Sequence, residues 1–529
     1  SLLDSKHSLF YSRGILSYQW KNPPTGLWGI FRSIGPGLII AGSIVGSGEL
    51  VATTKTGAQA GFWLLWLILI GCIIKVFAQV EFGRDAITRG RTTLGSLNQV
   101  PGPRFRVNWI VWYWLIMMMA GIAQLGGIVG GVGQALAITT PLTQVGKEFN
   151  LHHDKIIRRE VLSALISRQE KKSRFSDSDQ LSRLTAELDE FNKKDKENLV
   201  VAQSYDDVVW AFFLTLITAI VLVRGRYRLV QTLATILVTI FTVVTVWNLF
   251  ALQSLPDWRV TWNEFVLGLS FRLPPQGLSE ITSPLATALA TFGIIGVGAS
   301  ELIAYPYWCL EKGYAVWTGK CDESEAWIKR ARGWMRVLHW DAFLSAFVYT
   351  FATVAFYLLG AAVLGRTNLD PSGSQMIRTL SEMYVPVFGE TAHTIFLFGS
   401  ISVLYSTFFV ASAGLARVVA DALSVFGLVQ SDKATRQFWI RILSGVIPFC
   451  CFTVYAFVKA PVFLILLSGL TQAIMLPMLA FAALYFRYRR CHPQLQPGRW
   501  WDLFLWLSSV GLIIAGVWAA LTRIVPALI

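Results

Sequence analysis

The sequence has few charged residues, which make up 15% of its 529 positions. Soluble globular proteins carry about 25%, whereas hydrophobic residues here reach 54%. A soluble fold with so little polar surface is excluded, and so is a disordered chain. The six cysteines show no CxxC spacing and no Cys/His cluster, so neither a disulfide framework nor a zinc site is indicated. No HExxH, nucleophile-elbow or P-loop motif is present, which argues against an enzyme.

Long apolar runs dominate what the sequence does contain. A transmembrane helix needs about 20 mostly apolar residues, and windows of that length predict an all-α polytopic membrane protein with about eleven spans. No small-residue cleavage site follows the first run, so we expect a span there and not a signal peptide. The spans are predicted near 34–55, 61–82, 107–137, 206–223, 228–252, 284–310, 340–364, 391–424, 437–458, 461–486 and 501–522.

The distribution of Lys and Arg predicts the orientation of these spans. If the N-terminus is cytoplasmic, the inside segments hold 25 of these residues and the outside segments hold 7, the long insert apart. Cytoplasmic loops carry such an excess, so the N-terminus is expected in the cytoplasm. With about eleven spans, the C-terminus is then expected outside the cell. The expected location is a bacterial inner (plasma) membrane. The net charge of +14 is then a topology signal and requires no nucleic acid partner.

One segment departs from the apolar pattern. Residues 147–197 hold 12 Lys and Arg and 11 Asp and Glu, and their apolar residues recur at helical spacing. We expect a pair of amphipathic helices outside the membrane, within an extracellular insert over 141–205. Charged helical faces are usually solvated, although a contact with an extracellular partner through 147–197 stays open.

A short motif occurs twice, at an offset of 252 residues. Gly46-Ser47-Gly48-Glu49-Leu50-Val51-Ala52 in the first span matches Gly298-Ala299-Ser300-Glu301-Leu302-Ile303-Ala304 in the sixth, with four of seven positions identical. Because five spans separate the copies, the two run in opposite directions, which is typical of inverted repeats in secondary transporters. The expected organisation is a cytoplasmic segment (1–33), a first repeat (34–252), an extracellular loop (253–283), a second repeat (284–486), and a cytoplasmic loop with the eleventh helix (487–529).

Both copies should interrupt their helices near the middle of the membrane. Glycines crowd each copy, and Pro36 and Pro306 lie nearby; each Gly costs about 1 kcal/mol of helix propensity and each Pro about 3 kcal/mol. Glycine alone could serve close helix packing, as it does in the third span. A carboxylate at the centre of a span costs about 2.5–3.5 kcal/mol, however, so Glu49 and Glu301 are expected to form a site.

The donors near the two breaks predict the ligand of this site. Two close carboxylates match the charge of a divalent cation, and the serines Ser47 and Ser300 and the free carbonyls of the breaks add only oxygen. Oxygen donors suit Mg²⁺ or Ca²⁺ better than softer metals. Mg²⁺ usually keeps several waters, and the small residues Gly46 and Gly48 leave room for them, which favours Mg²⁺.

Four further motifs stand out along the spans: Gly35-Pro36-Gly37, the break at 46–49 with Ala52-Thr53-Thr54, Glu81-Phe82-Gly83-Arg84-Asp85, and Leu470-Thr471-Gln472-Ala473 with Pro477. Together they resemble the NRAMP family of divalent-metal transporters. The resemblance covers all the spans but not the 147–197 insert. It implies a leucine-transporter-type fold of two inverted five-helix repeats with an added eleventh helix.

The family motifs are altered at the metal ligands. Gly46-Ser47-Gly48-Glu49 stands where the family has Asp-Pro-Gly-Asn, and Leu302 and Ala304 match its sixth-helix Met and His. An alternative alignment takes Pro306 as the motif proline. The altered set is similar to the NRAMP-related magnesium transporters, which implies Mg²⁺ transport without proton coupling. The ligands then expected are Glu49, Gly46, Ser47, Gly48, Ala299, Ser300, Glu301, Leu302 and Gln472.

The leading hypothesis is therefore uptake of a largely hydrated Mg²⁺ by alternating access across the lipid bilayer. The metal is the transported substrate, and no cofactor and no catalytic residue are expected. A transporter of Mn²⁺ or of a broad set of divalent cations is the first alternative. A cation-coupled amino-acid symporter is the second, which two site carboxylates disfavour because the substrate is itself a carboxylate.

Overall fold

The computed structural model describes residues 20–37, 45–172, 182–189, 202–225, 227–275 and 283–524. Within them, nine helical segments are long and apolar enough to cross a membrane. They are formed by α4 (Leu65–Arg89), α6 (Trp109–Thr139), α9 (Asp206–Arg224), α12 (Pro284–Ile294) with α13 (Ala299–Lys312), α15 (Glu325–Leu359), α18 (Ala392–Val425), α19 (Lys433–Val458), α20 (Pro461–Tyr485) and α21 (Arg499–Ile524).

The other two predicted spans also have helices in the structure. The first continues as the π-helix η1 (Ser47–Thr53) and α3 (Thr54–Ala60), while residues 38–44 of the prediction lie outside the described residues. The fifth is α10 (Tyr227–Leu252), whose described apolar stretch runs from Ile236 to Leu252. The fold is thus the all-α polytopic membrane protein that the sequence predicts.

Short elements connect these helices. The strands β1 (Arg104–Phe105) and β2 (Val107–Asn108) form one small antiparallel pair in which Arg104 lies opposite Asn108. The short α-helices are α1 (Leu27–Ser33), α5 (Thr93–Leu97), α11 (Trp262–Gly268), α14 (Tyr314–Thr318), α16 (Met376–Ser381) and α17 (Val385–Phe388). Single turns of 3-10 or π-helix are η2 (Gly360–Leu364), η3 (Gly365–Thr367), η4 (Gly373–Gln375), η5 (Glu382–Tyr384), η6 (Gly389–Thr391), η7 (Phe486–Arg490) and η8 (Pro493–Leu495).

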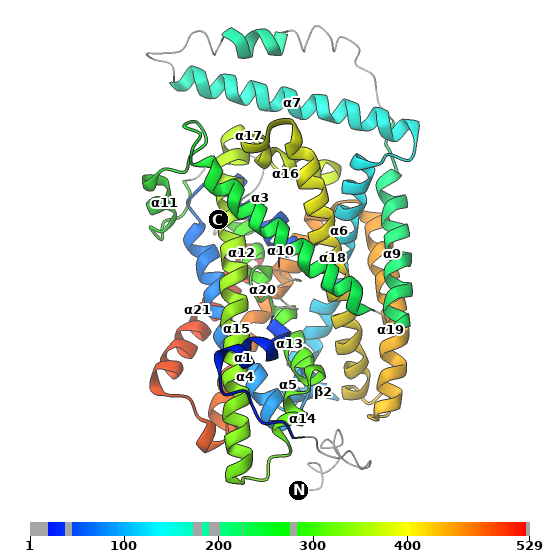
Figure 1. Cartoon of the computed structure of the whole chain (residues 1–529), viewed down its shortest axis with the longest axis vertical. Coiled ribbons are helices and arrows are strands. Elements are labelled where there is room, and N and C mark those ends of the chain that lie inside the picture. Colours follow the sequence, from blue (N-terminus) through cyan, green and yellow to red (C-terminus); the bar gives the residue numbers. More distant parts are fainter. Residues whose placement is uncertain are drawn as a thin grey trace.

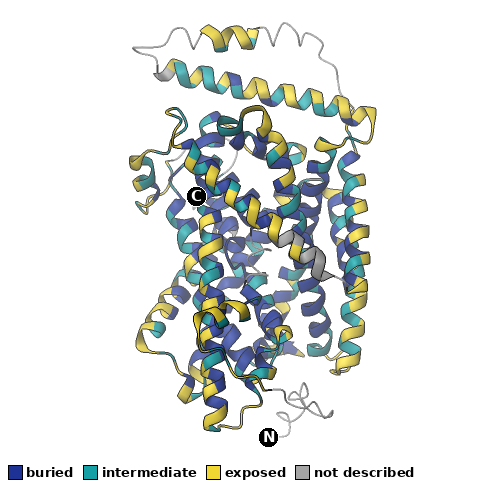
Figure 2. Ribbon diagram, viewed as in Figure 1, coloured by how far each residue is buried: buried dark blue, intermediate teal, exposed yellow. Residues whose placement is uncertain are grey.

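Burial separates the interior of the helix assembly from its flanks. Buried residues concentrate in the middle, on η1, α4, α12 and α20, whereas exposed residues follow the outer faces of α10, α19 and α21 (Figure 2). Those outer faces are apolar: Trp247 and Phe250 on α10 are each 65% exposed. Large apolar side chains on the outside of the molecule are expected where lipid is the solvent.

The charged insert forms helices that lie across one end of the molecule (Figure 1). Its first part is α7 (Gln144–Lys172), and residues 182–189 form a second, short helix. Arg158 of α7 is 2.6 Å from the Glu187 carboxylate of the second helix. Residues 173–181 and 190–201 of the predicted insert lie outside the described residues.

Candidate metal centre

The first helix changes its geometry at the predicted break. Gly46 has a non-helical backbone (φ −154°, ψ −124°), and the π-helix η1 begins at the next residue. A β-carbon on Gly48 would lie 3.0 Å from the carbonyl oxygen of Ile294 at the end of α12. Glycine at this position therefore lets the two interrupted helices approach each other closely.

The sixth span is also interrupted where the sequence predicts. Helix α12 ends at Ile294, Gly296 adopts a positive φ of 56°, and α13 begins at Ala299. The segment between them leaves the carboxyl end of α12 and the amino end of α13 facing the middle of the molecule. Half-helix ends of this kind are ion-binding elements in secondary transporters.

Glu49 is completely buried beside this second break. Its Oε1 accepts hydrogen bonds from the Gly296 backbone N–H at 3.1 Å and from Thr353 Oγ1 at 3.3 Å. Its Oε2 has no hydrogen-bond partner among the described residues. A buried carboxylate oxygen without a partner costs free energy, so this atom is available to a ligand or a proton.

Glu301 lies on the other side of the break, in a polar cluster. Its Oε2 is 3.1 Å from Ser300 Oγ, and Ser300 contacts Gln472 Oε1 through both its backbone N–H, at 3.0 Å, and its hydroxyl, at 2.7 Å. A β-carbon on Gly298 would lie 2.5 Å from Glu301 Oε2. The glycine that caps α13 is therefore required for the position of this carboxylate.

Hydrogen bonds through α6 connect the two breaks. Gln472 Nε2 donates to Gln124 Oε1 at 2.9 Å, and Gln124 Nε2 donates to Ser47 Oγ at 3.1 Å. Ser468 also donates to Gln124, at 2.9 Å. The sequence placed Gln472 at the site. Gln124 is not among the ligands that the sequence predicts, since a single glutamine in a glycine-rich helix also fits a helix-to-helix hydrogen bond.

A cavity of about 90 Å³ opens beside this cluster. Its polar lining comes from Ser47, Gln124, Ser300, Glu301 and Thr407, and its apolar lining from α6, α13 and α18. Glu301 is thus the carboxylate on the cavity. Glu49 is not among the described residues that line it, so the convergence of both carboxylates on one ion stays a prediction.

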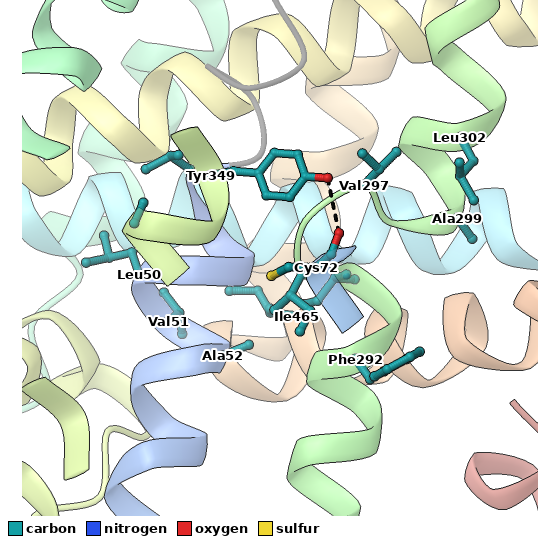
Figure 3. Close-up of a cluster of buried hydrophobic side chains, with 14 of the residues drawn as sticks. Leu50, Val51, Ala52, Cys72, Phe292, Val297, Ala299, Leu302, Tyr349 and Ile465 are labelled. Carbon is teal, nitrogen blue, oxygen red and sulfur yellow. Dashed lines mark hydrogen bonds between the residues drawn. The ribbon is translucent and has the colours of Figure 1, made fainter. Parts of the chain in front are cut away.

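Ala299 and Leu302 lie away from the cavity lining. Both side chains are fully buried, and they belong to the apolar cluster that surrounds the breaks (Figure 3). In the same cluster the Tyr349 hydroxyl donates to the Cys72 carbonyl oxygen at 3.2 Å. Any contact of Ala299 or Leu302 with an ion has to be made by a backbone carbonyl oxygen. Their assignment as metal ligands stays a prediction.

Lys75 of α4 is a charged residue within a predicted membrane span. The structure places its ammonium in the interior, fully buried, where it donates to the Ile295 carbonyl oxygen at 2.8 Å and to the Phe292 carbonyl oxygen. It also interacts electrostatically with Glu49 and Glu301. The sequence feature that points to an interior role for Lys75 is its position as a single lysine inside an otherwise apolar run.

The donor set is poor in protein ligands. Within the part of the chain that the structure describes, no group of three His, Cys, Asp or Glu side chains could hold a metal ion.

Two interrupted helices that face each other across a polar cavity define this molecule as a secondary transporter of the leucine-transporter fold. The family model "Natural resistance-associated macrophage protein-like" matches residues 199–522, more than half of the chain. The protein belongs to this family, Nramp. Family members are transporters and not enzymes, and they carry metal ions as substrates and not as cofactors.

Solved structures share the fold at low sequence identity. A variant of the manganese transporter from Eremococcus coleocola is 13% identical, with a TM-score of 0.60 over 97% of this chain and 92% of that one. MhsT in complex with L-phenylalanine is 14% identical, with a TM-score of 0.50 over 94% of this chain and 100% of that one.

The metal transporter Nramp6.2 of Populus trichocarpa is 32% identical over 79 residues, a match that spans 14% of that relative.

Proposed function

We propose that this protein transports divalent metal ions by alternating access, and that Mg²⁺ is its preferred substrate. The observation that carries the proposal is the polar cavity at the two helix breaks, with Glu301 on its wall and the unpartnered Oε2 of Glu49 behind it. Family membership supports the class of substrate.

The chemistry of the cavity favours a hard, hydrated ion. Its polar lining residues include Ser47, Gln124, Ser300 and Glu301, whose side chains offer oxygen ligands of the kind that suits Mg²⁺. A volume of about 90 Å³ has room for several water molecules. An ion that dehydrates reluctantly can therefore enter with part of its shell.

Mn²⁺ is the second candidate, and one observation favours it. Met117 and Met118 of α6 line the same cavity, and thioether sulfur suits softer metals. The manganese transporter of Eremococcus coleocola also shares this fold. Competition between the two ions in one uptake assay separates the candidates: with both ions at equal concentration, Mg²⁺ uptake should exceed Mn²⁺ uptake if Mg²⁺ is preferred.

Glu49→Gln and Glu301→Gln test the site directly. Each change removes one negative charge and keeps the shape of the side chain. We expect uptake of Mg²⁺ into proteoliposomes to be abolished by Glu49→Gln and to fall at least tenfold, about 1.4 kcal/mol, in Glu301→Gln. Glu390→Gln, at an exposed position of η6, is the matched control and should transport normally. Normal uptake by both site variants would refute the assignment.

We further propose that transport is not coupled to protons. No histidine occurs among the described residues that line the cavity, and the family histidine position is Ala304. A pH-sensitive dye inside the proteoliposomes should therefore report no acidification that grows with Mg²⁺ uptake. Acidification in proportion to the metal transported would contradict the proposal.

A further inference from the structure

A second cavity lies at the end of the molecule opposite α7, where α14 and the polar end of α4 meet (Figure 1). Its volume is about 650 Å³, and it is formed by the end of α4, the segment that joins α14 to α15, and η7 with the residues after it. Five basic side chains line it, against one carboxylate, Glu323; the five are Arg89, Arg91, Lys320, Arg489 and Arg490.

The inner wall of this cavity is held in place by hydrogen bonds. Arg490 is buried, and its Nη2 donates to Gln99 Oε1 at 2.9 Å. Arg89 donates to the Arg490 carbonyl oxygen at 2.8 Å. One carboxylate, Asp85, lies 3.6 Å from both guanidinium groups, so two positive charges share a single negative one. The wall keeps a net positive charge in a fixed geometry.

The mouth of the cavity adds exposed positive charge. Lys320 and Arg489 are exposed there. Helix α15, which is 35 residues long, begins at Glu325 beside the cavity, and Trp327 of its first turn is part of the lining. The positive end of the α15 helix dipole therefore lies beside the cavity, and it further favours the binding of an anion there.

Aromatic residues place this mouth at the surface of the membrane. Tyr488 lines the cavity, and its hydroxyl accepts a hydrogen bond from Trp506 Nε1 at 2.9 Å. Trp506 is 50% exposed and Trp500 is 75% exposed. Exposed Trp and Tyr side chains gather at the level of the lipid headgroups, so the cavity opens where headgroups lie.

We propose that this cavity binds a phosphate group, and that an anionic phospholipid supplies it. Arginine matches phosphate oxygens with paired N–H donors, and basic pockets between transmembrane helices on the cytoplasmic side hold acidic headgroups. The five basic residues supply the charge, and the exposed aromatic residues lie beside the acyl chains. This site is separate from the metal cavity.

Binding of short-chain phosphatidylglycerol to the purified full-length protein in detergent, followed by native mass spectrometry, tests the proposal. Lys320→Gln with Arg489→Gln should weaken binding about 30-fold, because each basic residue near a lipid surface contributes about 1 kcal/mol. The matched control is Lys329→Gln with Arg499→Gln, two exposed positions near the same end that do not line the cavity. It should bind normally.

Three outcomes would overturn the proposal. Equal binding by both double variants removes the cavity as the site. Equal affinity for phosphatidylcholine, which has no net charge, removes the need for an anion. Glycerol phosphate binding as tightly as phosphatidylglycerol replaces the lipid with a soluble phosphate ester at this site. None of these measurements depends on metal transport, so they succeed or fail independently of the proposed function.

Discussion

Three charged side chains lie inside the helix assembly, and the one that is positive interacts with both of the others. Glu49, Lys75 and Glu301 are fully buried or lie on the cavity, and the Lys75 ammonium interacts with both carboxylates. It also donates to two carbonyl groups at the carboxyl end of α12, where the helix dipole is negative. The lysine therefore offsets negative charge that would otherwise repel at the break.

Lys75→Met removes this ammonium and keeps most of the length of the side chain. The carbonyl groups of Phe292 and Ile295 then lose their buried donor, which should cost about 2–4 kcal/mol of stability. Thermal unfolding in detergent measures the loss as a lower melting temperature. Lys329→Met, at an exposed position of α15, should change stability by less than about 0.5 kcal/mol. An unchanged melting temperature for Lys75→Met would contradict the role.

At the residue scale the sequence singled out Glu49 and Glu301 as candidate site residues, but it did not predict how their side chains are arranged. Glu49 and Glu301 stand out because carboxylates in apolar spans are costly. That Glu49 turns to Gly296 and Thr353 while Glu301 faces the cavity depends on the π-helical geometry of η1. The bond from Gln124 to Ser47 joins two helices 77 positions apart, which no local pattern contains.

At the scale of single elements, α6 shows how glycine controls helix packing. A β-carbon on Gly126 would lie 2.7 Å from the Cys451 carbonyl oxygen of α19, and one on Gly127 would lie 2.6 Å from the Pro461 carbonyl oxygen of α20. Both neighbours are backbone atoms, which cannot rotate away. The glycines of this helix thus act as the small residues that let membrane helices approach.

Gly127→Ala should therefore destabilise the protein by about 1–3 kcal/mol, because the added methyl group forces α6 and α20 apart. Gly121→Ala is the control in the same helix, since nothing lies within 4 Å of a β-carbon there. The control should be neutral or slightly stabilising, because alanine favours helix by about 1 kcal/mol. Thermal unfolding compares the two, and an equal effect of both changes would contradict the packing argument.

Local hydropathy predicted where along the chain the membrane-spanning helices lie, but it did not predict where each helix begins and ends. The predicted span at 340–364 lies within a continuous helical segment, Glu325–Thr367, that starts much earlier than the prediction. The additional turns are polar in sequence, and they are stabilised by Trp327, Ile328 and Ala331, which pack against Leu495 far along the chain. A hydropathy window measures transfer to lipid and contains no information on this contact between distant segments.

On the scale of the whole molecule, the insert is attached to the end that it covers. Arg378 of α16 donates to Asn150 Oδ1 of α7 at 2.8 Å and forms an ion pair with Asp154, and Arg168 donates to the Asp257 carbonyl oxygen at 2.5 Å. The apolar side of α7 is buried at Ile157 and Leu162. The insert therefore marks one face of the membrane protein, opposite the basic cavity.

Because α7 and the basic cavity lie at opposite ends of the molecule, the proposed orientation can be tested directly. In this orientation α7 is outside the cell and the basic end is cytoplasmic. A chain that carries Ser163→Cys on the exposed side of α7 and Cys321→Ser should react with a membrane-impermeant maleimide in intact cells. The native chain, whose exposed Cys321 lies at the opposite end, should react only after permeabilisation. Cys450 faces outward from α19 in both chains and provides a common background. If Cys321 but not the α7 cysteine is labelled in intact cells, the proposed orientation is wrong. The basic end of the molecule would then lie outside the cell, against the usual excess of positive charge in cytoplasmic loops.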